Sequence, residues 1–129
     1  MLNDLWIISR EGIPLIELFN NTKIDSGLLG AFLSAIKSFS EEIGAGSVTH
    51  LVLGNKKLVL SPCVDGHAYL VSQTDVNVKD KKIRKIFKVL GEFFEELYSA
   101  EDIINWDGDL SLFDKFKDRI DIYFQMYDL

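Results

Sequence analysis

The sequence predicts an α/β fold, a three-layer α/β/α sandwich around a five-stranded, mostly antiparallel sheet. Five short β-prone segments and three amphipathic helical segments support this fold class. In the first of the strands, Leu5 and Ile7 alternate with Trp6 and Ile8. Because alternate side chains of a strand point to opposite faces, this strand is apolar on both faces. Such a strand needs a covering layer on each side, and three helices can supply both layers.

The N-terminal part of the chain is expected to form two strands joined by a tight turn. Residues 5–9 and 14–19 are rich in apolar and β-prone side chains. Gly12 can adopt the positive φ that the turn between them requires. Pro14 lacks a backbone N–H, so it belongs at the start of its strand or on a sheet edge.

A helix is expected next, over residues 26–43. Asp25 or Ser26 can accept hydrogen bonds from its first free N–H groups, and Gly44 can end it. Three short strands follow, over residues 47–53, 56–61 and 67–73. The first two flank Gly54-Asn55, which is typical of a two-residue hairpin turn.

Two helices close the chain. Residues 79–99 place apolar side chains at helical spacing, and residues 101–108 are interpreted as a connection. Asp109 or Ser111 can cap the third helix. The predicted order is therefore β-β-α-β-β-β-α-α, within one domain spanning residues 1–129.

Composition and charge exclude several classes of protein. The net charge of −6 disfavours binding to nucleic acid and general attachment to anionic lipid. Cys63 is the one cysteine, so no internal disulfide can form, as is typical of the reducing cytoplasm. No apolar run approaches the roughly 20 residues that a membrane helix needs. The N-terminus lacks the basic start of a signal peptide, and the C-terminus lacks a lipidation cysteine. We expect a soluble cytoplasmic protein without an integral membrane segment.

The order of these segments and their hydrophobic patterns resemble those of the longin domain over nearly the whole chain. They also resemble the free-standing longin-like proteins of archaea related to eukaryotes. The features that carry the resemblance are the opening Leu5-Trp6-Ile7-Ile8-Ser9 with Gly12-Ile13-Pro14-Leu15, the helix over residues 28–43, the meander through residues 48–53, 58–60 and 69–71, and the two closing helices.

The resemblance implies a non-catalytic interaction module. Longin domains occur in vesicle SNAREs, coat adaptors, tethering complexes and regulators of small GTPases, and they commonly pair through the first helix and third strand. The related roadblock fold begins with a helix, for which there is no room before Leu5. The chain also stops after its third helix, without the coiled coil and anchor of a vesicle SNARE. We therefore expect an adaptor or platform for small GTPases or trafficking-like machinery, paired in a homodimer or heterodimer with a longin- or roadblock-type protein or a GTPase.

The first helix carries the predicted interface. At 100° per residue its apolar side chains spread over roughly 200°, whereas an ordinary surface helix needs an apolar stripe of about 100°. Part of this surface is then left for a partner, and small residues beside it allow close helix approach. The third strand can pair at the same interface by β-augmentation. Alternatively, the C-terminal segment covers this helix, or its small residues are neutral surface. The expected interface residues are Gly27, Leu29, Gly30, Ala31, Leu33, Ser34 and Ser38 on the helix, with Val48, His50 and Val52 on the strand.

A basic segment opens the second helix. Six basic residues lie between positions 79 and 88, where the helix dipole favours acids. Lys81, Arg84 and Lys85 are therefore candidates for contact with an anionic partner or headgroup. The alternative is a solvated charged face without a specific ligand.

No catalytic residue, metal ligand or cofactor site is expected. Cys63 and His67 flank a turn, but a nucleophile also needs an orienting group and an oxyanion site, for which there is no signal. Two histidines and one cysteine make a poor zinc set. Residues 107–109 begin like a calcium loop, but Leu112 stands where glycine is required and Asp118 where glutamate is.

A second function class stays open from the sequence. A small-molecule-sensing domain of profilin-like or PAS-like topology would hold its ligand between the sheet and a helix. A large apolar cavity beside the sheet favours the sensor, and a tightly filled core favours the interaction module.

Overall fold

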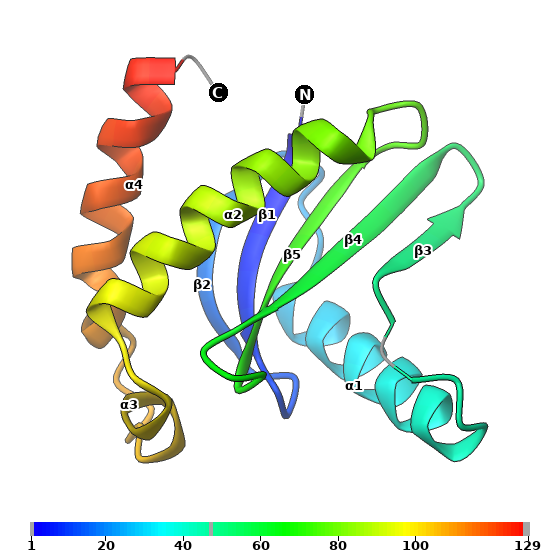
Figure 1. Ribbon diagram of the computed structural model, residues 1–129, viewed down its shortest axis with the longest axis horizontal. Helices are drawn as coiled ribbons and strands as arrows, with labels where there is room; N and C mark the ends of the chain where they lie inside the picture. The colour runs from blue at the N-terminus through cyan, green and yellow to red at the C-terminus, as the bar shows by residue number, and fades with distance from the viewer. Residues whose placement is uncertain (1, 47, 128–129) are drawn as a thin grey trace.

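A five-stranded antiparallel sheet forms the middle layer of the protein (Figure 1). Its strand order is β2-β1-β5-β4-β3. The computed structural model describes residues 2–46 and 48–127. Every neighbouring pair of strands is antiparallel. The elements are β1 Leu2–Ser9, β2 Pro14–Asn20, α1 Ser26–Glu42, β3 His50–Leu53, β4 Lys56–Cys63, β5 Ala68–Asp75, α2 Asp80–Leu97, α3 Ala100–Ile104, a 3-10 turn Leu110–Phe113 and α4 Asp114–Tyr127.

Helices cover both faces of this sheet, which confirms the three-layer sandwich. Figure 1 shows α1 on one side of the sheet and α2 on the other, with α4 beside α2. Leu5 and Ile7 enter the larger core beneath α2 and α4. Trp6 and Ile8 enter the smaller core beneath α1. The two-sided apolar pattern of β1 is thus the physical reason for the two helical layers.

The predicted turns are confirmed at their glycines. Gly12 has φ +91° between β1 and β2, and Gly54 has φ +65° in the two-residue β3–β4 hairpin. Pro14 begins β2, which is an edge strand, so its missing N–H removes no bond from the sheet interior. Asp25 caps α1 by accepting a hydrogen bond from the Leu28 N–H at 2.8 Å.

The structure differs most from the prediction at two segments. Residues 101–108 do not form a plain connection, because α3 begins at Ala100. A capping box explains this helix: the Ser99 hydroxyl accepts from the Asp102 N–H, and the Asp102 carboxylate accepts from the Ser99 N–H. The third strand is also shorter than predicted, since Val48 and Thr49 precede β3 and Ser47 lies outside the described residues.

Two glycines bring α1 against the β1–β2 turn at very short range. A Cβ on Gly30 of α1 would overlap the carbonyl oxygen of Gly12. A Cβ on Gly12 would in turn lie 2.6 Å from the carbonyl oxygen of Gly30. The two backbones therefore touch without an intervening side chain, and this contact fixes the position of α1 over the sheet.

We predict that Gly30→Ala destabilises the protein by about 2 kcal/mol, because overpacking at a site without room to yield outweighs the gain in helix propensity. Denaturant unfolding measures the change. Gly91→Ala is the matched control, since Gly91 also lies within a helix and its Cβ would meet only Leu70 Cδ1 at an ordinary 3.7 Å. That variant should be neutral or stabilised by up to about 1 kcal/mol. Equal stabilisation of both variants would contradict the close contact.

Candidate interaction surface

Helix α1 buries a different part of its apolar arc from the one that we expected. Leu29 and Leu33 are 6% and 7% exposed and pack in the core beneath the helix. The prediction that they are free for a partner is therefore wrong. Apolar periodicity shows the width of the arc, but it does not show which part of that arc faces the sheet.

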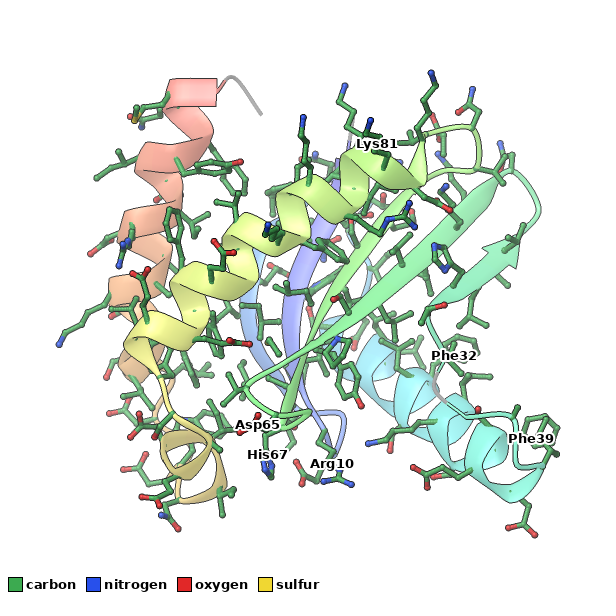
Figure 2. The ribbon with its side chains drawn as sticks, in the orientation of Figure 1. Arg10, Phe32, Phe39, Asp65, His67 and Lys81 are labelled. Atoms are coloured by element: carbon green, nitrogen blue, oxygen red, sulfur yellow. The ribbon has the colours of Figure 1, made fainter. Side chains whose placement is uncertain are left out.

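Four large apolar side chains of α1 and its C-cap remain exposed and form a stripe, which we call the α1 stripe. Its members are Leu28, Phe32, Phe39 and Ile43, and Leu28 and Phe39 are 70% and 62% exposed. Their spacing of four, seven and four residues places them on one side of the helix. Figure 2 shows Phe32 and Phe39 projecting from α1 on the side nearest β3.

A hollow continues the α1 stripe onto the edge of the sheet. Its lining includes Leu28 and Phe32 from α1 and the exposed Leu53 from β3. Gln73 lies in the same lining, and its buried Oε1 accepts no hydrogen bond from the part of the chain that the structure describes. A buried acceptor without a donor costs free energy.

Strand β3 provides a backbone edge beside the α1 stripe. It is the last strand in the sheet order, so within the described sheet it pairs with β4 alone. Unpaired backbone N–H and C=O groups on such an edge can accept another strand. Leu53 of β3 lines the same hollow as Leu28 and Phe32, so the edge lies beside the α1 stripe.

His50 and Val52 point away from the α1 stripe. They pair across the ladder with Val59 and Lys57, whose side chains lie on the α2 face of the sheet. The His50 Nε2 lies 3.5 Å from the Asp80 carboxylate at the start of α2. The sheet therefore separates these two side chains from α1, although their backbones stay on the shared edge.

The small residues of α1 lie on the flank that faces the β1–β2 turn. Gly30 is buried against Gly12, so the expectation that it accommodates an external helix is wrong. Ser34 is half-buried beside the same turn, whereas Gly27, Ala31 and Ser38 are exposed. The small-residue flank and the α1 stripe are thus two separate surfaces of one helix.

The basic residues of α2 also divide between two directions. Lys81 and Lys85 are exposed, and Arg84 lines a groove with His50 between α2 and the β3–β4 edge.

At the start of the helix, Lys57 Nζ donates to the Asp80 carboxylate at 2.6 Å and to the Val78 carbonyl oxygen at 2.6 Å. The Lys57 hydrogen bond holds the pKa of Asp80 below its ordinary value.

Cys63 has the surroundings of a packed thiol. It is buried in the larger core, and desolvation, with a smaller contribution from the Glu95 charge, raises its pKa to about 12. The thiol is therefore protonated at neutral pH and is a weak nucleophile. Within residues 2–46 and 48–127, no group of three His, Cys, Asp or Glu side chains is placed to hold a metal ion.

A cavity of about 220 Å³ lies beside the sheet on the α1 side. Its walls include Ile8, Leu33 and Tyr69, with Arg10 and Lys37 among its polar groups, and Val48 lines it as well. Sites for drug-sized ligands span roughly 300–1,000 Å³. This cavity lies below that range, whereas the open hollow beside Leu28, Phe32 and Leu53 has about 490 Å³, so cavity volume does not separate the two function classes.

Comparison with known proteins agrees with this architecture. No family model matches the sequence, and no curated protein matches it. Among solved structures, the chain is similar to MglB of Myxococcus xanthus, a roadblock/longin-like fold, with 17% identity and a TM-score of 0.54 over 76% of this chain and 80% of that one. With the strand order, this match defines the class: the chain has a longin-like fold. None of the described helices is both long and apolar enough to cross a membrane.

We predict that Cys63 resists alkylation by iodoacetamide in the folded protein at pH 8 and reacts when the chain is unfolded. The folded pKa lies above the unfolded value near 9, so the protonated thiol contributes stability that is present below pH 9 and lost as the pH rises toward 12. Mass spectrometry of labelled native and denatured samples measures the difference. Equal labelling rates in both states would show that the thiol is not buried.

Proposed function

We propose that this protein is an interaction module that pairs through the α1 stripe and the β3 edge with a second copy or with a related longin- or roadblock-type chain. The observation that carries the proposal is the coincidence of an exposed apolar stripe and an open strand edge on one side of the molecule. Contiguous exposed apolar surface on a soluble fold is typical of protein–protein contact sites.

The physical fit supports pairing rather than ligand capture. The α1 stripe offers aromatic side chains, which supply much of the binding energy in protein interfaces. The β3 edge adds directional backbone hydrogen bonds.

The cellular role follows from the longin resemblance alone. We propose that the paired module is an adaptor or platform for a small GTPase or for trafficking-like machinery. The fold supports this role because longin-type domains act as binding platforms.

We predict that the purified chain sediments at about twice its mass of 14.7 kDa and that Phe39→Lys weakens the association at least about tenfold. The reason is that a lysine charge replaces a large, 62% exposed apolar side chain of the α1 stripe. Sedimentation velocity over a concentration series measures the association, and thermal unfolding checks the fold.

Ser38→Lys is the matched control, because it adds the same charge to the neighbouring position on the small-residue flank. That variant should keep the wild-type mass. If the wild type is a monomer, the same two variants are compared for binding to a longin- or roadblock-type partner isolated from the native cell. Equal behaviour of Phe39→Lys and Ser38→Lys in the relevant assay would contradict the α1 stripe as the interface.

The GTPase role makes a separate prediction. The immobilised chain should retain a small GTPase from the native cell in a nucleotide-dependent manner, differing between GDP and a non-hydrolysable GTP analogue, because GTPase switch segments change conformation with the nucleotide. Mass spectrometry of the retained proteins measures this. Retention of no GTPase, or of the same amount in both nucleotide states, would count against the platform role and leave the pairing intact.

A further inference from the structure

Positive charge is concentrated at one end of α2. Lys81, Lys82, Lys85 and Lys88 lie on the N-terminal half of the helix, followed by the acidic Glu92, Glu95 and Glu96. The ammonium groups of these four lysines form no ion pair with a carboxylate in the part of the chain that the structure describes. A protein with a net charge of −6 therefore presents a local cationic surface.

Exposed apolar side chains on α4 lie beside this cationic surface. Ile122 and Met126 are 60% and 72% exposed. They form one wall of a groove whose other wall carries Lys82, Lys85 and Val89 of α2. A largely apolar groove with lysines on one wall thus joins the two helices.

The groove opens toward one end of the molecule. Figure 1 shows α2 and α4 approaching each other near α3 and diverging toward the end where α4 finishes. Figure 2 shows Lys81 at this same end, well away from the α1 stripe residues Phe32 and Phe39. Farther along the helices, Arg119 is already paired with Glu96 at 2.8 Å and lies over the Phe93 ring. The unpaired lysines of α2 therefore lie nearer the open end than Arg119 does.

We propose that this end, formed by the lysines of α2 with Ile122 and Met126 of α4, docks on an anionic lipid bilayer. Clustered lysines gain favourable energy at an anionic membrane surface, and apolar side chains beside them gain more by entering the headgroup boundary. The acidic half of α2 is repelled by the same surface, so the charge separation orients the protein with this end toward the lipid.

The apolar residues decide between a bilayer and an acidic protein surface. An acidic patch would neutralise the lysines but would leave Ile122 and Met126 without an apolar environment. A bilayer accommodates both kinds of side chain, since anionic headgroups lie directly above hydrocarbon. This docking end lies away from the proposed pairing surface, so it does not rest on the proposed function.

Vesicle flotation tests the proposal with the full chain. One set of vesicles is phosphatidylcholine alone, and the other contains about one third phosphatidylglycerol. We expect binding to the anionic vesicles that weakens as salt is raised, with little binding to the neutral set. Lys82→Glu with Lys85→Glu should weaken binding at least about tenfold. Met126→Ser should weaken it with the net charge unchanged, because an apolar contact is lost.

Lys23→Glu with Lys115→Glu is the charge-matched control. Each Lys→Glu change subtracts two charges, so both double variants fall from −6 to −10. The control should bind at most slightly less than the wild type, and Phe39→Lys should keep full binding. Thermal unfolding confirms that each variant is folded. Equal loss in the two double variants, equal binding of the wild type to both vesicle sets, or binding to an acidic protein without vesicle binding would overturn the proposal.

Discussion

The direct contact between Gly12 and Gly30 determines how α1 lies on the sheet. Because neither residue has a Cβ, the helix approaches the β1–β2 turn more closely than other side chains allow. This contact lies on one flank of the helix, so Leu29 and Leu33 turn toward the sheet and Leu28 and Phe39 remain exposed. The surface that we propose for pairing is therefore a consequence of a backbone contact on the opposite side of α1.

The sheet places the two proposed surfaces on different sides of the molecule. The α1 stripe and the β3 edge lie on one side, while the cationic end of α2 and the exposed side chains of α4 lie across the sheet (Figure 1). The two are separated by central strands such as β1, which carries core side chains on both faces. Such an arrangement allows a protein partner and a lipid surface to be contacted together, without competition for the same residues.

Much of the architecture could be predicted because it depends on local patterns. Alternation in β1, helical spacing in α2, and the turn glycines Gly12 and Gly54 each act within a few residues. The order of the five strands and three main helices along the chain was predicted from these patterns, and the structural similarity to MglB supports the same longin-like fold. The short α3 was missed although its capping box, Ser99 with Asp102, is present in the sequence. A helix of five residues has too little apolar periodicity to stand out from a loop.

The sequence by itself determined that α1 is apolar over more of its circumference than the sheet can cover, and that basic residues gather at the start of α2. Only the tertiary structure decided which apolar residues are exposed, where Gly30 packs, and that Ile122 and Met126 lie near the α2 lysines. The physical reason is the distance along the chain over which the deciding interactions act. Periodicity describes a helix relative to its own axis, whereas its rotation against the sheet and its neighbours are set by contacts between residues far apart in the chain.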